Sequence, residues 1–421
     1  MTTPRTVGII GGTLWGNRGA EAMLVTSIGQ VRERYPGAQI IVFTYLAKKD
    51  AQLLTDPSIT LIDSRPQALV LGHFPFAVLA WLFRLVGIKL PDGVLSPSVR
   101  ALRRCDVLLD ISGISFAAGR EKYLPFNILI IWPAMLLGVP VVKLAQAVGP
   151  FKNPLNRIAA RIFLGACYRL YARGEKTGTY LQDLKVNNWK PSADIAFLYK
   201  PAYSLSNENP DKVVALAETL AAVRAQGHMV IGLSPSSLVY NNSVKRDRDY
   251  VGQFLKLIRN LDASYHYVLL PNATREGSEK GRNNDLFVID LIMQRSKREL
   301  SREMQSRVHA VDFDLNTDGS RQLIALCDLV VTSRFHGMVS SLSLQVPVMV
   351  IGWSHKYAEV LAEFELDHFA VDFNDPNLDM QAMINNLVTT RAEVQNKLAT
   401  GLAKVQAKSA QQFSDLADLL Q

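Results

Sequence analysis

Short apolar runs alternate with segments of helical periodicity along most of the chain. At the start, Val7–Ile10 is continuously apolar, Gly11–Gly19 is rich in glycine, and Ala20–Val31 has helical spacing. A second apolar run follows at Ile40–Phe43. Because strand, helix and strand in this order form a βαβ unit, the pattern predicts a parallel sheet with helices on its faces.

The same alternation predicts further strands in both halves of the chain. In the first half they are Val107–Asp110, Val139–Ala145, Leu170–Ala172 and a run near Ile195. In the second half they are Met229–Leu233, Tyr267–Leu270, His309–Val311, Leu329–Thr332 and Val348–Ile351. Between the later strands we expect helices at Asp211–Arg224, Tyr250–Leu261, Asp285–Met293, Arg321–Leu326, Met338–Leu344 and Tyr357–Phe364. This arrangement is typical of doubly wound, Rossmann-like domains.

The length indicates two domains, because 421 residues exceed what one hydrophobic core usually organises. The polar, proline-bearing segment from Lys200 to Asp211 is the best linker candidate. We therefore predict an α/β fold of two Rossmann-like doubly wound domains facing a cleft. The predicted division is 1–200 for the N-terminal domain, 201–211 for the linker, 212–375 for the C-terminal domain, and 376–421 for C-terminal helices.

One internal similarity connects the two halves. The sequence CDVLLDISG, which starts at Cys105, resembles CDLVVTS, which starts at Cys327. In each case Cys-Asp precedes an apolar strand that ends in a small polar loop. Open α/β sheets bind ligands outside the carboxyl ends of their strands, so these loops are expected to form the two sides of a cleft.

Composition excludes several classes of protein. Hydrophobic residues make up 48% and charged residues 20%, which excludes intrinsic disorder and a coiled-coil rod. A net charge of +8 suits anionic ligands or an anionic membrane surface and falls short of a nucleic-acid coat, so no nucleic-acid partner is expected. The cysteines Cys105, Cys167 and Cys327 form neither a disulfide framework nor a metal-ligand spacing. We expect a cytoplasmic protein without a metal, whose first apolar run is too short for a signal peptide.

Two apolar windows raise the question of a membrane. Tyr123–Val142 has no charged residue, but three prolines interrupt it. Gly72–Leu90 contains His73, Pro75 and Arg84 and has a one-sided, aromatic character. Neither window is expected to span a bilayer, because both lie within the α/β pattern. The second predicts a helix that rests on the protein core, a partner or a lipid surface, and peripheral membrane contact stays open.

The most informative motif is VVTSRFHGMVSS. A predicted strand ends at Thr332, Arg334 and His336 follow, and a helix begins around Gly337. The N–H groups and dipole of a helix start bind anions, and a guanidinium forms a planar fork that matches carboxylate or phosphate. An imidazole titrates near neutrality and can transfer a proton. The structural alternative is a surface arginine–acid pair and a capping histidine.

A second motif, GGTLWGNRGAEA, precedes the first predicted helix. Gly12 permits a close approach of the backbone to a ligand, and Asn17 and Glu21 are expected at the mouth of the loop. The motif matches neither GxGxxG nor GxxxxGK[ST], which argues against NAD and against a P-loop. An ordinary tight turn, with Glu21 as a first-turn acid, is the alternative.

Three more loops follow predicted strands and carry polar side chains. They contain Asp110 and Ser112, Arg173, and Lys356 with its neighbour His355. Taken singly, each is as well explained by a solvated loop. Their shared placement at strand ends makes them candidate ligand contacts.

Together these motifs resemble the polysaccharide pyruvyl transferase family. The resembling segments are GGTLWGNRGAEAML, CDVLLDISGISF, VVKLAQAVGPF, YARGEKTGTYL and SRFHGMVSSLSLQVPVMVIGWSHKY. The resemblance implies a glycosyltransferase-B-like fold and transfer of a pyruvyl group from phosphoenolpyruvate, a substrate and not a cofactor, to a sugar, usually as a cyclic ketal. It also implies donor binding by Arg334 and His336, with Lys356 and Arg173 at family-like positions. The C-terminal domain is then expected on the donor side and the N-terminal domain on the acceptor side.

The resulting hypothesis assigns a role to each group. Arg334, the helix start at Gly337 and Lys356 neutralise the donor, while His336 assists phosphate departure or proton transfer. Glu21 or Asp110 is the base for the acceptor hydroxyl. Arg334→Ala and His336→Ala are expected to cut turnover by orders of magnitude and leave the fold intact, because both residues lie on a loop.

Two other functions stay open at this stage. A sugar-nucleotide glycosyltransferase would use the same architecture and release a nucleoside diphosphate. A non-catalytic carbohydrate-binding protein is the second, since Gly113-Ile114 stands where many family members have two glycines and an acidic residue. The acceptor is expected to be a sugar of a polysaccharide or of a lipid-linked oligosaccharide, which would place the protein at the inner face of the membrane. The sequence does not predict the oligomeric state.

Overall fold

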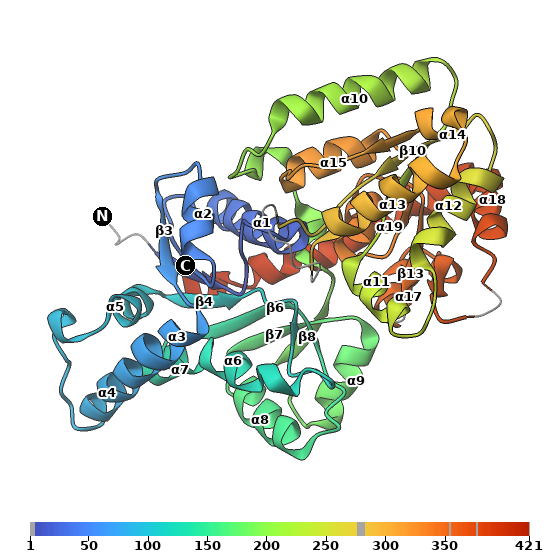
Figure 1. The fold of residues 1–421 in the computed structure, drawn as a ribbon. Coiled ribbons are helices and arrows are strands. Elements are labelled where there is room, and N and C mark those ends of the chain that lie inside the picture. The colour runs from blue at the N-terminus through green and yellow to red at the C-terminus, as the bar shows by residue number, and fades with distance from the viewer. Residues whose placement is uncertain (1–4, 276–282, 353–354, 376–377, 421) are drawn as a thin grey trace. The chain divides into compact units, whose positions relative to one another are not determined.

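The computed structural model describes residues 5–275, 283–352, 355–375 and 378–420. The chain divides into two compact α/β units (Figure 1). Unit 1 comprises Met1–Trp15, Ala20–Leu205 and Gln406–Gln421, and unit 2 comprises Gly16–Gly19 and Ser206–Val405. The passage from unit 1 to unit 2 at Leu205 thus falls within the predicted linker segment. A short stretch of the first glycine-rich loop, Gly16–Gly19, belongs to unit 2.

Unit 1 is built on a parallel sheet with the strand order β3-β2-β1-β4-β6-β7-β8, and β5 pairs with β6. The strands are β1 (Thr6–Ile10), β2 (Gln39–Thr44), β3 (Ile59–Asp63), β4 (Val107–Asp110), β5 (Ile114–Ser115), β6 (Val141–Val148), β7 (Arg169–Arg173) and β8 (Trp189–Ser192). The central strands β1 and β4 are buried along their whole length, as expected for a sheet covered on both faces.

Helices cover the sheet of unit 1. They are α1 (Arg18–Arg34), α2 (Ala47–Leu53), α3 (Pro66–Ala68), α4 (Phe74–Leu85), α5 (Pro97–Arg104), α6 (Leu124–Leu129), α7 (Trp132–Leu137), α8 (Pro154–Gly165) and α9 (Glu175–Asp183). A π-helical turn, Leu69–His73, joins α3 to α4 without a break. Side-chain caps set some of the starts, for example Ser96 for α5 and Asn153 for α8.

Unit 2 repeats the architecture with the strand order β11-β10-β9-β12-β13-β14, again parallel. Its strands are β9 (Val230–Ser234), β10 (His266–Leu269), β11 (Val308–Ala310), β12 (Leu329–Thr332), β13 (Val348–Gly352) and β14 (Ala370–Asp372). Its helices are α10 (Pro210–Ala225), α11 (Ser237–Val244), α12 (Tyr250–Asn260), α13 (Asp285–Glu299), α14 (Arg302–Ser306), α15 (Thr317–Ala325), α16 (Phe335–Ser343), α17 (His355–Ala362) and α18 (Met380–Thr389).

The C-terminal segment is helical, as its periodicity predicts. It continues after α18 with α19 (Arg391–Ser414) and α20 (Ala417–Leu420). The division between the units falls inside α19, because residues up to Val405 group with unit 2 and those from Gln406 group with unit 1. In unit 1, Gln412 accepts a hydrogen bond from the backbone N–H of Ala145 (2.8 Å) and donates one to the carbonyl of Ala193 (2.9 Å).

The internal similarity of the sequence has a structural counterpart in each unit. Asp106 accepts a hydrogen bond from the N–H of Thr6 (2.7 Å) at the start of β1, and Asp328 accepts one from the N–H of Val230 (2.9 Å) at the start of β9. In the same two strands a Cβ added to Gly8 would lie 3.0 Å from the sulfur of Cys105. The corresponding distance from Gly232 to the sulfur of Cys327 is also 3.0 Å. The two Cys-Asp motifs therefore make equivalent contacts in two similar sheets: the aspartate accepts a hydrogen bond from the neighbouring strand, and the cysteine packs against its glycine.

The prediction of a strand near Ile195 is wrong, since residues Ile195–Leu198 form a 3₁₀ helix. The strand of this region is β8, whose sequence Trp-Lys-Pro-Ser is polar and partly exposed. The sequence pattern also missed β3 and β14. All three lie at the edge of a sheet, where one side of the strand has no neighbour and no continuous apolar run is needed.

The two apolar windows differ in structure. Tyr123–Val142 is divided among α6, α7 and β6, so it forms no continuous helix. Pro66–Leu85 is the one described helical stretch that is long and apolar enough to cross a membrane, judged by length and composition alone. Only 17% of its most apolar part is buried in the protein.

Candidate active site

In unit 2 a set of polar loops lies at the carboxyl edge of the sheet, after the neighbouring strands β9, β12 and β13. Helix α16 begins one turn after β12, with Arg334 in the N-cap position. Gly337 permits this tight junction, because a Cβ at that position would lie 2.6 Å from Oγ1 of Thr332. The positive end of the helix dipole lies at the start of α16, which makes this position suitable for an anion.

The guanidinium of Arg334 is buried and held by an acid. Its Nε donates to Oδ2 of Asp285 (2.9 Å), and its Nη2 donates to Oδ1 of Asp285 and to Oγ of Ser237 (3.1 Å). Nη1 donates to the side-chain oxygen of Asn283 over a longer distance of 3.3 Å. The arginine is therefore fixed by a two-point ion pair, and Nη1 is the least tightly bound corner of the guanidinium.

Asp285 is the residue that orients this arginine, and it is fully buried. Its carboxylate also accepts hydrogen bonds from the backbone N–H groups of Ser237 (2.9 Å), Asn272 (3.1 Å) and Ala273 (2.8 Å). One carboxylate thus ties the loops after β9 and β10 to the start of α16. The expectation of an arginine that can be removed from a loop without cost does not hold, because Arg334 lies in a buried ion pair.

The ring of His336 packs directly on Gly19. A Cβ on Gly19 would lie 2.1 Å from Nδ1 and 2.3 Å from Cγ of His336. Asn17 fixes this turn, since its side-chain oxygen accepts a hydrogen bond from the N–H of Gly19 (3.0 Å) and so caps α1. The glycine-rich motif that contains Gly19 and the motif that contains His336 are therefore in contact within unit 2.

The segment Gly16–Gly19 is anchored by its arginine. Arg18 is buried, forms an ion pair with Glu208 (2.8 Å) and donates to the carbonyl of Leu315 (2.5 Å). Its own N–H donates to the carbonyl of Asn272 (3.0 Å), and its carbonyl accepts from the hydroxyl of Thr317 (3.0 Å). These contacts hold Asn17 and Gly19 in place beside His336.

Lys356 lies next to the same motif. Its Nζ is 5.3 Å from the centroid of the Phe335 ring and 5.2 Å from that of Tyr357. Cation–π contact holds an ammonium close to aromatic faces. Since Phe335 stands between Arg334 and His336, the structure brings Lys356 to the predicted motif.

A buried tyrosine supports the loop after β12. Tyr250 donates to Oγ of Ser333 (2.8 Å) and accepts from the N–H of Ser236 (3.1 Å). Burial raises the pKa of Tyr250, so its hydroxyl stays protonated and able to donate. The loops after β9 and β12 are thereby joined a second time.

In unit 1 the remaining candidates gather at the carboxyl edge of β1, β4 and β7. Asp110 is fully buried, forms an ion pair with the equally buried Lys143, and accepts hydrogen bonds from Ser112. A Cβ on Gly11 would lie 2.4 Å from Oγ of Ser112, so the loop with Gly12 packs on the loop after β4. The position of Asp110 indicates that it shapes this loop.

Arg173 is also held by a carboxylate. It forms a buried ion pair with Asp194, and its Nη2 donates to the carbonyl of Gly113 (3.2 Å). Glu21, in the first turn of α1, is buried. The structure thus brings Asn17, Arg334, His336, Gly337 and Lys356 together in unit 2, and places Gly12, Glu21, Asp110, Ser112 and Arg173 in unit 1.

Sequence reasoning missed the partners of these cations: Asp285, Lys143 and Asp194. Asp285 was expected only as the first residue of a helix. Lys143 lies in an apolar strand, β6, and its charge there was a signal, because a fully buried lysine needs a partner. Asp194 follows β8, the strand that the pattern misplaced.

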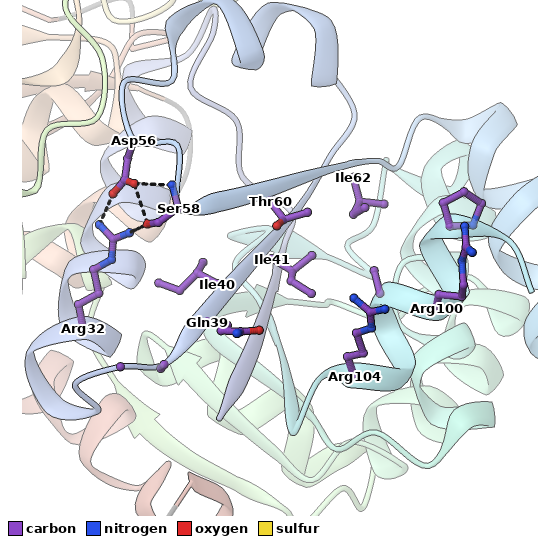
Figure 2. Close-up of a pocket in the computed structure, with 14 residues that line it drawn as sticks. Arg32, Gln39, Ile40, Ile41, Asp56, Ser58, Thr60, Ile62, Arg100 and Arg104 are labelled. Carbon is purple, nitrogen blue, oxygen red and sulfur yellow. Dashed lines mark hydrogen bonds and ion pairs between the residues drawn. The ribbon is translucent and has the colours of Figure 1, made fainter. Parts of the chain in front are cut away.

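The sheet of unit 1 also has an open hollow of about 900 Å³ that contains no predicted site residue. Figure 2 shows Arg32, held by Asp56 (2.7 Å), at one end and Arg100 and Arg104 at the other. The hollow lies beside the amino-terminal half of β2 and along β3, whereas ligands of open α/β sheets bind outside the carboxyl ends of the strands. We assign no catalytic role to it. Within the described ranges no group of three or more His, Cys, Asp or Glu could hold a metal ion.

Two parallel-sheet α/β units define the chain as a protein of glycosyltransferase-B-like fold. It is similar over 98% of its length to all of UDP-GlcNAc 2-epimerase from Neisseria meningitidis bound to UDP-GlcNAc, with a TM-score of 0.54 at 12% identity. A structure described as trehalose-6-phosphate from E. coli, bound with UDP-2-fluoro glucose, gives a TM-score of 0.57 at 12% identity over 99% of both chains. These similarities establish the predicted fold.

The sequence comparisons give the family. The model of the family described as polysaccharide pyruvyl transferase matches residues 17–355. The chain therefore belongs to the polysaccharide pyruvyl transferase family, which confirms the resemblance found in the motifs. A named relative is the amylovoran biosynthesis protein AmsJ of Erwinia amylovora, 23% identical over 313 residues, which are 71% of this chain and 69% of that protein.

Proposed function

We propose that the protein transfers the pyruvyl group of phosphoenolpyruvate to two hydroxyls of a sugar in a polysaccharide or its lipid-linked precursor. The methylene carbon of the donor gains a proton and becomes a methyl group, and one sugar oxygen bonds to C2. The bond from C2 to the phosphate oxygen then breaks, and the second sugar oxygen closes the ketal. The two hydroxyl protons are accounted for by the new methyl group and by the released phosphate.

The observation that carries this proposal is the group of cations at the start of α16. Arg334 occupies the N-cap position of α16, and Lys356 lies against the ring of Phe335 in its first turn. The start of a helix also carries the positive end of the helix dipole. Phosphoenolpyruvate carries a carboxylate and a phosphate. A guanidinium, an ammonium and the start of a helix all bind anionic groups of this kind. Family membership supports the same donor.

The ion pair with Asp285 determines which nitrogen of the Arg334 guanidinium can contact a ligand. Because Nε and Nη2 are held by Asp285, only Nη1 is left to turn toward a ligand, and a donor carboxylate would replace the long bond to Asn283. Lys356 and the helix start supply the rest of the positive potential. His336, held against Gly19, is our candidate for proton transfer to the departing phosphate.

On the acceptor side we assign the base to Glu21. Both candidates are buried, but the other one, Asp110, is already neutralised by Lys143. In the proposal Asp110 positions Ser112, because its carboxylate accepts hydrogen bonds from the N–H and the hydroxyl of Ser112. Asp110 is then a positioning residue.

The test compares donors directly. Calorimetric titration with phosphoenolpyruvate is expected to show binding, and incubation with phosphoenolpyruvate and extracted polysaccharide is expected to release inorganic phosphate. Binding of a uridine diphosphate sugar with release of the nucleoside diphosphate, and no response to phosphoenolpyruvate, would replace the proposal with a glycosyltransferase. Polysaccharide binding without a response to either donor would indicate a carbohydrate-binding protein.

Gly19→Ala tests the placement of His336 without removing a functional group. The new methyl group would need the space of the imidazole, 2.1 Å from Nδ1, so the ring must move. We expect kcat to fall by at least about tenfold, since a displacement of about 1 Å can cost 10²-fold in rate. Gly165→Ala is the matched control, because a Cβ at that helical glycine meets nothing within 4 Å. Equal activity of both variants would argue against a role for the ring at this position.

A further inference from the structure

Unit 1 exposes a continuous apolar segment at the end of α4. From Trp81 to Lys89 every residue is exposed. Six of these nine are large and apolar: Trp81, Leu82, Phe83, Leu85, Val86 and Ile88. Side chains of this kind scattered singly need no explanation, but a contiguous patch marks an interaction surface.

A second helix on the same side of the sheet repeats the pattern. Leu155, Ile158 and Ile162 follow helical spacing along α8 and are 58% exposed or more. The ring of Trp132 on α7 connects the two helices, since it lies 4.7 Å from the ring of Phe74 on α4 and 5.3 Å from the ring of Phe163 on α8. Figure 1 shows α4, α7 and α8 on one face of the sheet of unit 1. We refer to the exposed apolar residues of α4 and α8 as the α4–α8 surface.

The charge around the α4–α8 surface is almost entirely positive. The segments 66–104 and 152–165 contain eight lysines and arginines and one acid, Asp92. Their net charge of +7 nearly equals the +8 of the whole chain. Asp92 is itself paired with Arg103. Positive charge beside exposed apolar and aromatic side chains is the pattern of proteins that lie on anionic lipid.

We propose that the α4–α8 surface binds an anionic lipid bilayer, with Trp81, Phe83 and their apolar neighbours entering the boundary between headgroups and acyl chains. Lys89, Lys152 and Arg161, all exposed, lie among the cations that contact the lipid phosphates. The inference goes beyond the proposed function and does not depend on it. It would place the enzyme where a lipid-linked sugar is available.

The packing of α4 argues for a helix that lies on the membrane and does not cross it. Leu69, His73 and Ala77, each four positions apart, form one buried stripe that packs on unit 1. Nε2 of His73 is bonded to the carbonyl of Asp63 (2.9 Å). Arg84 donates to the carbonyl of Leu137 (3.1 Å) and ties the far end of α4 to the unit. Crossing a bilayer would require all of these contacts to break.

Charge also argues for lipid over a second copy of the chain. In a two-fold symmetric dimer the same surface meets itself, so the excess of positive charge would face an equal excess. An anionic bilayer presents negative charge to the whole α4–α8 surface. Each lysine or arginine that lies close to the lipid headgroups then contributes to binding.

The test is sedimentation of the full chain with vesicles, without any donor or acceptor, so that its outcome is independent of the proposed function. We expect binding to vesicles containing phosphatidylglycerol, much weaker binding to phosphatidylcholine alone, and loss of binding at high salt. The double substitution Trp81→Glu with Phe83→Glu is expected to lower the partition coefficient at least about tenfold, and Lys89→Gln or Arg161→Gln about fivefold each. Val214→Glu, at a 51% exposed valine on α10 in unit 2, is the matched control.

Depth of insertion gives a second measurement. Brominated acyl chains are expected to quench the fluorescence of the bound protein, and Trp81→Phe is expected to remove most of this quenching while binding is retained. Absence of binding to the anionic vesicles would overturn the proposal, as would an equal loss in Val214→Glu. The proposal also fails if the Trp81 and Phe83 double variant still binds vesicles while a dimer of the parent chain becomes a monomer, because the surface would then be a self-interface.

Discussion

Replacing His336 with alanine is expected to lower the kcat of pyruvyl transfer by about 10²- to 10⁴-fold, the usual range for loss of a general acid or base. The fold should persist, because His336 is only half-buried and stands in the first turn of α16. The change also opens space beside Gly19, on which the ring packs. Phosphate release from phosphoenolpyruvate in the presence of acceptor, followed at saturating donor, measures the effect.

The control for this experiment is His368→Ala. His368 is an exposed histidine of unit 2 whose ring is tilted against that of the neighbouring Phe369, with the two ring centroids 4.3 Å apart. Its loss should leave kcat within twofold of the parent. If His336→Ala retains parental kcat, the proton-transfer role is excluded, and the ring serves only to pack on Gly19.

Among the described strands, those in the middle of a sheet were predictable, whereas three of the four that end the two sheets were missed. β1, β4, β9 and β12 lie in the middle of their sheets, so both faces must be apolar and the sequence shows a continuous run. The edge strands β3, β8 and β14 have partly exposed, polar residues. A pattern of apolar runs cannot distinguish such strands from loops, because their stability comes from pairing with one neighbour.

The Cys-Asp similarity was informative for a physical reason. Aspartate before a central strand accepts an N–H from the neighbouring strand, and cysteine is small enough to face a glycine across it. These two requirements recur because both units use the same strand order at their centre. The glycines Gly8 and Gly232, which complete the contact, lie far from the cysteines in sequence and could not be paired with them beforehand.

The site was predictable in part. Strand ends and polar loops identified Arg334, His336 and Lys356, because the carboxyl edge of a parallel sheet is where loops meet. Their partners depend on tertiary packing. Asp285, the acid of Arg334, follows a different strand and looked like an ordinary helix start. The contact of His336 with Gly19 joins residues that are far apart in the sequence.

Substituting Asp285 with asparagine is expected to destabilise unit 2 by about 3–5 kcal/mol, the cost of removing one partner of a buried ion pair. Both carboxylate oxygens accept hydrogen bonds, Oδ1 from Ser237 and Arg334, and Oδ2 from Asn272, Ala273 and Arg334. An amide nitrogen in either position would therefore point at N–H donors, and no rotation of the side chain removes the conflict. By calorimetry the transition of unit 2 should fall by about 6–20 °C, since 1 kcal/mol shifts a domain of this size by about 2–4 °C.

Two further variants separate the ion pair from general damage. Asp290→Asn, at an exposed carboxylate on the same helix, should change stability by no more than about 0.5 kcal/mol. Adding Arg334→Met to Asp285→Asn should recover part of the loss, because the buried guanidinium no longer lacks its counter-charge. If the two substitutions together cost the sum of their separate effects, the pair is not coupled. Arg334 would then be free to act on the donor without Asp285, and the single-corner geometry assigned to its guanidinium would have to be abandoned.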